Sequence, residues 1–453
     1  MLKRSNRPRH ETTPAETPRP SGPPDPGVSP AAVLTEGPIE ASDGGAWSRL
    51  FGSLSIPGFR WLWFGTLFAT AGMQMGIISQ PWLAYHISGS ATVLGLVALS
   101  RGLPMLVFSF IGGVAADRFD RRKLLITMQS LLGLLALTTA LLVHTGAIQV
   151  WHLVALSIVQ GTVFPFYMPT RQAIIPELVG QQRMGNAIAL SSTGMNLNRV
   201  LAPTAAGLLL ALNPSLAFYA AATFYTLSAL TLVGLPHVHG ERRESARQGP
   251  VKDMLVGLRY VFGQPVLATL MGLAFVVVLL GMPFQQFLPV FQADVLHVDE
   301  LGLGLMYAFV GIGSLVGSLS MAYFAGSRGR GLVQIASGVG FGFALVLFSL
   351  STTYSLSLAV LLLLGLASQG YMTINNVLIM ENTNRALYGR VMSVYMMTWS
   401  LMPLSVLPMG ALVDRVGAPM TVGGVGILLT AFFFVVALVR QDLWRRQQPT
   451  AAS

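Results

Sequence analysis

The chain has 453 residues, of which 53% are hydrophobic and only 10% are charged. Soluble domains carry about a quarter charged residues, so this composition excludes an ordinary soluble protein. The formal net charge is +10, but the basic residues fall in short stretches between apolar runs. That distribution indicates orientation in a membrane rather than nucleic-acid binding. The chain has no Cys and its seven His residues are scattered, so we expect no disulfide, metal site or cofactor.

The two ends of the chain differ from the rest. Residues 1–48 are rich in Pro, Gly, Ser and Thr and contain no apolar run, which predicts a disordered cytoplasmic tail. Lys3 and Arg4 are followed by no hydrophobic stretch, so the beginning does not resemble a signal peptide. Residues 441–453 are expected to form a second cytoplasmic tail.

Twelve apolar segments follow the first tail, each about as long as a bilayer core is thick. They lie at 60–86, 91–116, 124–144, 149–172, 185–211, 215–235, 266–291, 301–325, 332–351, 355–379, 388–412 and 420–440. The pattern predicts an all-α integral membrane protein with twelve transmembrane helices.

Lys and Arg gather in alternate connections between these segments. The connections near 87–90, 145–148, 212–214, 292–300 and 352–354 contain none. The others hold Arg118–Lys123, Arg183, Arg242–Arg259, Arg328 with Arg330, and Arg385, and only Arg415 lies on the opposite side. By the positive-inside rule, both termini are predicted to be cytoplasmic in a multi-pass protein of the bacterial inner membrane.

The segments divide into two halves, 49–235 and 266–440. Residues 236–265 between them are basic and then amphipathic, which predicts a cytoplasmic linker with an interfacial helix. A shift of 204 residues aligns Gly161 with Gly365, Tyr167 with Tyr371, and Glu177 with Glu381, among others. We therefore expect two pseudo-symmetric six-helix halves, an architecture of parallel repeats known among transporters.

The turn between the second and third segments carries a recognisable pattern. Residues 113–123 read Gly-Val-Ala-Ala-Asp-Arg-Phe-Asp-Arg-Arg-Lys, which resembles the helix 2–3 loop signature of the major facilitator superfamily. Asp120 stands where the family usually has Gly. The plainer interpretation is that any membrane hairpin needs a polar, basic turn.

Further runs resemble one branch of that superfamily, which includes enterobactin exporters and macrolide efflux proteins. They are residues 166–179, 186–190 and 198–199, Arg101–Pro104, Leu288–Phe291, Gly389–Ser393 and Gly410–Gly417. The resemblance covers about residues 55–440. It implies a twelve-helix exporter of amphipathic organic molecules such as drugs or siderophores, driven by proton antiport and acting as a monomer.

The loop signature suggests a cytoplasmic latch between the halves. Its expected members are Gly113, Asp117, Arg118, Arg121, Arg122, Arg171, Gly389 and Arg390. Asp117 would lie against the N-terminal end of helix 11, where unpaired N–H groups and the helix dipole favour an anion. The alternative is that Asp117 only sets the topology or caps a turn.

Polar and aromatic residues within the segments are candidates for a substrate cavity. They are Gln74, Arg101, Gln160, Tyr167, Asn198, Arg199, Gln285, Gln286, Gln369, Tyr371, Asn375 and Asn376. Arg101 and Arg199 lie deep in the membrane, where a charge is costly unless it faces water or a partner. Each could attract an anionic group or could instead stabilise a contact between helices.

The fifth segment contains an antiporter-like motif. The motif is Gly-Pro-x-x-Gly-Gly in antiporters of the superfamily, and this chain has Ala202, Pro203, Ala206 and Gly207 at the four defined positions. Small residues and a Pro suit helices that approach closely and move, although small-residue packing is common in membrane bundles.

No Asp or Glu lies in the middle of a segment, so the residue that couples transport to protons is not evident. An importer on the same fold is the alternative to an exporter. A membrane enzyme is disfavoured, because the chain has no Ser/His/Asp, HExxH or phosphate-loop pattern.

Overall fold

The computed structural model describes residues 51–236, 250–324 and 329–439, without the side chains of 110–118, 181, 250–253, 322–324 and 386. The chain divides into two compact units, Met1–Arg49 and Leu50–Ser453. The predicted tails at both ends and the basic part of the linker lie outside the described residues. Everything below concerns the second unit.

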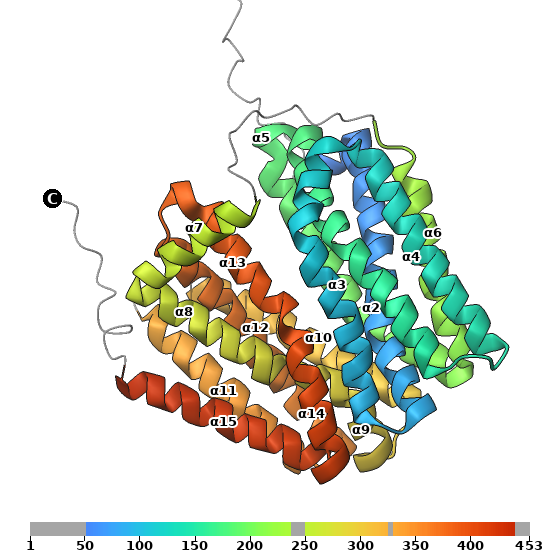
Figure 1. Ribbon diagram of the computed structural model, residues 1–453, viewed down its shortest axis with the longest axis vertical. Helices are drawn as coiled ribbons and strands as arrows, with labels where there is room; N and C mark the ends of the chain where they lie inside the picture. Colours follow the sequence, from blue (N-terminus) through green and yellow to red (C-terminus); the bar gives the residue numbers. More distant parts are fainter. Residues whose placement is uncertain (1–50, 237–249, 325–328, 440–453) are drawn as a thin grey trace, which may run out of the picture. The chain divides into compact units, whose positions relative to one another are not determined.

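The described part of the chain is helical, and twelve of its helical spans are long and apolar enough to cross a membrane (Figure 1). The first half contains η2 (Gly52–Ser55), α2 (Pro57–Ser88), α3 (Ala91–Arg118), α4 (Arg121–His144), α5 (Val150–Leu212) and α6 (Pro214–Leu232). The second half contains α7 (Pro250–Gly263), α8 (Pro265–Val276), α9 (Leu288–Val290), α10 (Glu300–Phe324), α11 (Arg330–Leu350), α12 (Tyr354–Glu381), η6 (Arg385–Leu387), α13 (Tyr388–Ser400), α14 (Met402–Val416) and α15 (Ala418–Val439). The prediction of twelve spans in two six-helix halves is confirmed.

Helix α5 contains two spans, Val150–Gly180 and Gln182–Leu212, joined by a bend at Gly180. Gly180 has φ 68° and ψ 173°, a conformation that L side chains rarely adopt, so Gly permits the reversal. The sequence predicted that the first of these spans ends near residue 172, before Pro176. In the structure Pro176 lies inside the helix, because neighbouring membrane helices satisfy the backbone groups that a Pro leaves free.

Two spans predicted as single helices are interrupted. Between α8 and α9 the seventh span passes through a π-helical stretch, Val277–Gly281, and a 3₁₀ stretch, Met282–Phe287. The eleventh span breaks at Leu401 between α13 and α14, where Pro403 begins the second piece. Such irregular turns mark points where a helix can change direction.

The bundle has two distinguishable ends. At one, which we call the α7 end, α2, α4, α8 and α13 begin and α3, α6, α10 and α12 end. At the other, which we call the opposite end, short turns join α2 to α3 and α14 to α15. Figure 1 shows α14 beside α3, whereas α13 diverges from α3 toward the α7 end.

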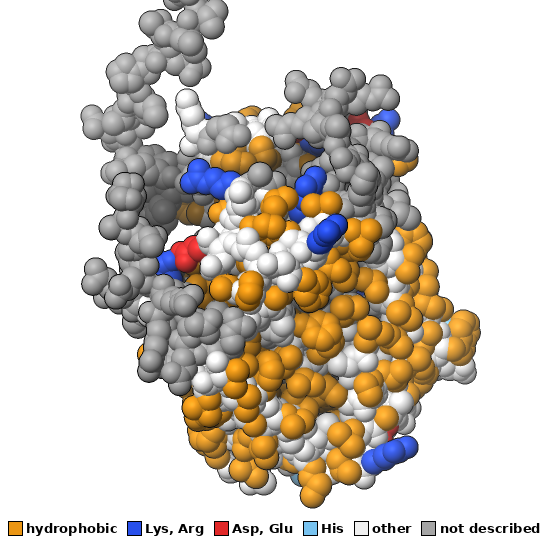
Figure 2. Space-filling view, turned by 60° about the vertical axis from the view of Figure 1, so that its left-hand side comes forward, with side chains coloured by type: hydrophobic (Ala, Val, Ile, Leu, Met, Phe, Trp, Pro, Cys, Tyr) orange, Lys and Arg blue, Asp and Glu red, His pale blue; other side chains and the backbone are white. Residues whose placement is uncertain are grey.

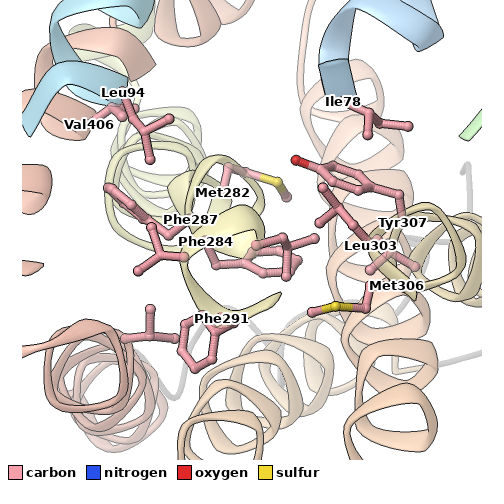
Figure 3. Packing of buried hydrophobic residues seen from close by; sticks show 14 of the residues in the cluster. Ile78, Leu94, Met282, Phe284, Phe287, Phe291, Leu303, Met306, Tyr307 and Val406 are labelled. Carbon is pink, nitrogen blue, oxygen red and sulfur yellow. The ribbon is translucent and has the colours of Figure 1, made fainter. Parts of the chain in front are cut away.

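The hydrophobic cores follow this division. A large cluster toward the opposite end contains side chains from both halves, including Ile78 and Leu94 from the first and Phe284, Leu303 and Val406 from the second (Figure 3). At the α7 end, one cluster around Phe59 and Ile174 belongs to the first half alone. Another around Leu270 and Ile374 belongs to the second half alone. Among the described residues, the halves therefore share a core only toward the opposite end.

Apolar side chains also cover the outside of the bundle. Val107, Leu134 and Phe343 are each more than half exposed, and Figure 2 shows hydrophobic side chains over most of one face, with most of the visible Lys and Arg toward one end. Exposed apolar surface of this extent is expected where lipid tails surround a protein.

Candidate functional site

The first contact between the halves is a seam of α3 against α14. A Cβ placed on Gly95 would lie 2.4 Å from Leu407 Cα, and one on Gly410 would lie 2.3 Å from the Ala91 oxygen. A Cβ placed on Gly102, at the end of the seam, would lie 2.4 Å from the ring of Pro403. Only residues without a side chain allow two helices to approach this closely.

The second contact is a seam of α5 against α10. Gly207 would place a Cβ 2.6 Å from the Glu300 oxygen, and Gly304 would place one 2.7 Å from the Pro203 oxygen. Ala202 and Ala206 are buried beside them, at 5% and 0% exposure. All four residues of the predicted helix 5 motif thus lie in or next to a seam.

Asp414 closes the end of the α3–α14 seam. Its carboxylate accepts hydrogen bonds from the backbone N–H groups of Ala91 (2.6 Å) and Thr92 (3.0 Å), and from the hydroxyls of Ser90 and Thr92, both at 2.6 Å. These donors form the N-terminal end of α3, where a helix leaves N–H groups unpaired and its dipole attracts a negative charge. Asp414 is therefore an N-cap supplied by the other half, and it stabilises the conformation closed at the opposite end.

A second polar contact joins the halves at the same end. The Tyr85 hydroxyl of α2 donates to the Asp294 carboxylate, 2.5 Å away, in the last turn of the seventh span. The Asp414 contact and the Tyr85–Asp294 contact thus both join the halves at the opposite end.

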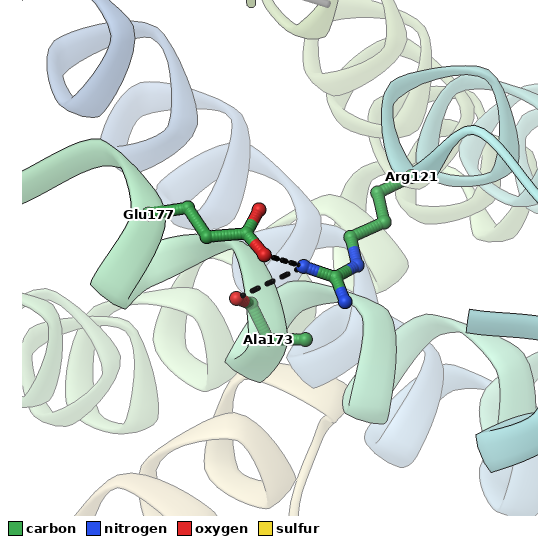
Figure 4. Close-up of polar contacts among 3 residues, drawn as sticks. All are labelled: Arg121, Ala173 and Glu177. Carbon is green, nitrogen blue, oxygen red and sulfur yellow. Dashed lines mark hydrogen bonds and ion pairs between the residues drawn. The ribbon is translucent and has the colours of Figure 1, made fainter. Parts of the chain in front are cut away.

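At the α7 end, two carboxylates bind arginines of their own half. Arg121 at the start of α4 pairs with Glu177 of α5 and donates to the Ala173 oxygen at 3.4 Å (Figure 4). Arg330 at the start of α11 pairs with Glu381 of α12 in the second half. Glu177 and Glu381 are related by the predicted repeat, so the two ion pairs are pseudo-symmetric. They hold each half together and do not join one half to the other.

Three described members of the predicted latch, Arg121, Arg122 and Arg171, make contacts within their own half. The side chains of Asp117 and Arg118, and the surroundings of Gly113, lie outside the described residues. Arg122 donates to the Val233 oxygen, and Arg171 is buried with its Nε 3.1 Å from the Thr66 hydroxyl. Asp120 caps α4 by accepting from the Lys123 N–H at 3.0 Å, which explains its use in place of the usual Gly.

Asp117 was expected to bind at the start of α13. A Cβ on Gly389 would have no heavy atom within 4 Å, and the backbone of Arg390 faces Gly257 of α7. The latch thus stays a prediction.

Arg101 of α3 lies where the two halves meet. It lines a small pocket with Gln80 of α2 and Gln286 of the 3₁₀ stretch, among apolar residues such as Ile77 and Ala98. The backbone of the neighbouring Gln285 is held by the Tyr307 hydroxyl, 2.6 Å from its oxygen. The interrupted seventh span therefore brings two predicted cavity residues to the boundary between the halves.

Arg199 of α5 contacts the second half directly. Its Nη1 donates to Gln369 Oε1 of α12 at 3.2 Å. The preceding Asn198 instead binds within the first half, donating to the Leu67 oxygen and the Thr70 hydroxyl, both at 2.7 Å. In this conformation Asn198 ties α5 to α2.

The remaining cavity candidates are less accessible. Tyr167 and Tyr371 are buried, at 8% and 0% exposure, and Tyr371 packs edge-on against Phe433. Asn375 accepts a hydrogen bond from Gln334 at 2.6 Å. Gln74, Gln160 and Asn376 are half-buried.

Asp414 is the residue that the site prediction omitted. A signal for it exists, because Gly410-x-x-x-Asp414-Arg415 repeats the Gly-x-x-x-Asp-Arg order of Gly113–Arg118. One copy ends the second span and the other ends the eleventh, and these are the two helices that form the first seam. Tyr85 and Asp294 carry no comparable signal in the sequence.

Comparison with known families identifies the chain. The profile of the family described as "Transmembrane secretion effector", within the major facilitator superfamily, matches residues 48–451. The chain belongs to this family. It is a multi-pass membrane transporter of the superfamily's efflux branch, as the resemblance implied.

Relatives similar to the chain in sequence include two named exporters. The chain is 28% identical over 368 residues to the multidrug efflux pump Tap of Mycobacterium tuberculosis, covering 78% of this chain and 86% of Tap. It is 26% identical over 408 residues to the enterobactin exporter EntS of Shigella boydii, covering 87% of this chain and 94% of EntS.

The solved structures confirm the fold of this family member. The crystal structure of the nucleoside transporter NupG matches with a TM-score of 0.68 over 85% of this chain and 99% of NupG. Sequence identity is 12%, so the match concerns the major facilitator fold alone.

Proposed function

We propose that this transporter exports amphipathic organic molecules from the cytoplasm by alternating access, coupled to proton antiport, in the bacterial inner membrane. The observation that carries the proposal is the arrangement of the two halves. They share a hydrophobic core and two glycine-lined seams toward the opposite end, and they have separate cores at the α7 end. Rocking of the halves about this junction would expose the polar residues between them to either side in turn.

The α7 end is the cytoplasmic end in this proposal. Arg121, Arg122, Arg183 and Arg330 lie there, whereas Arg415 lies at the opposite end, and positive residues favour the cytoplasmic side. The conformation described here is then the one that receives cargo from the cytoplasm.

The latch around Asp117 belongs to the alternate conformation. When the halves close at the α7 end, Asp117 would cap α13 near Gly389 as Asp414 caps α3 near Ala91. Asp414 would then stabilise the state closed at the opposite end, and Asp117 would stabilise the state closed at the α7 end. Each contact requires α3 and the eleventh span to be apart at the other end.

The relatives favour export over import. Tap and EntS are named as exporters and cover most of this chain. An importer on the same fold is the second candidate, since the fold itself is shared with a nucleoside transporter and does not set direction. Both activities need a small-molecule substrate and the bilayer, and the proposed export also needs protons. We propose that the protein acts as a monomer.

Everted membrane vesicles test the function and its direction. Vesicles that contain the protein would be loaded from outside with a panel of dyes, macrolides and catecholates, with and without a protonophore. An exporter accumulates a panel member in everted vesicles, and the protonophore abolishes the accumulation. Accumulation only in right-side-out vesicles would establish the importer, and accumulation that the protonophore leaves unchanged would exclude proton coupling.

A further inference from the structure

Both seams between the halves end at an arginine. On α3, Gly102 makes the seam's last close approach to α14 among the described residues, and Arg101 precedes it. On α5, the last close approach to α10 is made by the Arg199 backbone oxygen, which would lie 2.6 Å from a Cβ placed on Gly311. Beyond these points, toward the α7 end, each half has its own core. Two guanidinium groups therefore lie where the junction between the halves stops.

Among the described residues, no carboxylate pairs with Arg101 or Arg199. Arg199 donates to the neutral amide of Gln369, and Arg101 lines its pocket among neutral residues. The acidic residues of the described spans lie at or near span ends, namely Glu177, Asp294, Glu300, Glu381 and Asp414. A positive charge deep in a membrane protein is costly and typically serves a function.

We propose that Arg101 and Arg199, one at the end of each seam, each bind an anionic group of the cargo, and that the preferred cargo is an amphipathic organic carboxylate or phenolate. The inference rests on the proposed transport function and specifies its substrate class. A guanidinium group binds a carboxylate through two parallel hydrogen bonds and is weakly hydrated, so it suits a site of low polarity. Gln80, Gln286 and Gln369 add neutral donors and acceptors, and Ile77 and Ala98 add apolar surface.

The position of the two arginines also suits alternating access. In the present conformation they lie at the inner limit of the region between the separated halves. When the two seams separate, the space between the halves would reach the same arginines from the opposite end, because they lie where the seams stop. Each arginine can then bind an anion from one side and release it to the other.

Fluorescence titration of the purified protein in detergent tests the site without a transport gradient. The probes are dansylglycine, a carboxylate, and its neutral methyl ester, which has nearly the same shape. We expect wild-type protein to bind dansylglycine at least about tenfold more tightly than the ester, a ratio that corresponds to about 1.4 kcal/mol. Equal binding of the two probes, tighter binding of the ester, or no binding of either would overturn the proposal.

The variants Arg101→Gln and Arg199→Gln assign the preference to the two side chains. Each should weaken dansylglycine binding about tenfold and change ester binding less than about twofold, with an unchanged elution profile. Arg259→Gln, an exposed arginine on α7, is the matched control and should change neither. Equal weakening of both probes would assign the arginines to structure and overturn the proposal. If the Gln variants do not fold, the wild-type comparison of the two probes decides.

The test separates this inference from the proposed function. Selective dansylglycine binding by a protein that accumulates no panel member in vesicles would refute the transport proposal alone. Transport of the panel without any preference for anions would refute the anion site alone.

Discussion

At the scale of single residues, Asp414 has the most specific role that the structure assigns. One carboxylate accepts four hydrogen bonds from the start of α3, which belongs to the other half. Removing an N-cap costs about 0.5–2 kcal/mol. A change of 1–2 kcal/mol alters a two-state balance about five- to thirtyfold, so the conformational balance should be sensitive to this residue.

Asp414→Ala should therefore favour the state that is open at the opposite end. The measurement is the rate at which a maleimide labels single cysteines in detergent, at Leu94 in the shared core and at Met396 on α13. Leu94 is 2% exposed and Met396 is 52% exposed. We expect labelling at position 94 to rise and labelling at position 396 to fall. Arg415→Ala, the neighbouring exposed residue, is the control, and equal changes in both variants would contradict the role of Asp414.

Asp117→Asn should have the opposite effect if the latch at the α7 end exists. Labelling at position 396 should rise and that at position 94 should fall, because the state closed at the α7 end loses its cap. Expression and binding of cargo should stay close to wild type, while transport falls. Labelling identical to wild type would show that Asp117 only sets topology or caps a turn. In the double variant with Asp414→Ala and Asp117→Asn, the two changes in labelling at each position should largely cancel, since the sites are independent.

At the scale of helices, the structure depends on close approaches that only glycine allows. The α5–α10 seam illustrates this, since Gly207 and Gly304 face each other's backbones. The interruptions of the seventh and eleventh spans lie at the level where the seams end, so these spans can follow different paths in the joined and the separated parts of the bundle.

Gly207→Ala should open the α5–α10 seam. The new methyl group would lie 2.6 Å from the Glu300 oxygen, and overpacking of this kind costs about 1–3 kcal/mol. We expect transport to fall about tenfold and a cysteine at Leu210, which is 2% exposed, to become reactive. Gly76→Ala in α2 is the control, because no atom lies within 4 Å of its Cβ position. Similar losses in both variants would exclude the seam as the cause.

At the scale of the whole molecule, the orientation in the membrane follows from charge. The chain has no native Cys, so single cysteines report sidedness directly. In intact cells, an impermeant maleimide should label a cysteine at Ala147, in the turn before α5, and should not label one at Arg247, in the linker. Labelling at 247 without labelling at 147 would invert the proposed topology and with it the assignment of the open end.

Much of the fold could be predicted from the sequence because its causes are local. A bilayer requires about 20 apolar residues per helix, so helix number follows from counting apolar runs. The repeat that pairs Glu177 with Glu381 revealed the two halves. Even the small residues around Pro203 indicated a close approach, although they could not name α10 as the partner.

The tertiary structure alone decided which end of the bundle is closed and what closes it. Asp414 and Ala91 are 323 residues apart in the chain, and no local pattern shows that one caps the other. The same holds for Arg199 and Gln369, and for Tyr85 and Asp294. Apolar length and charge determine that helices cross the membrane, whereas the packing of two halves against each other determines which of two conformations they adopt and which polar residues lie between them.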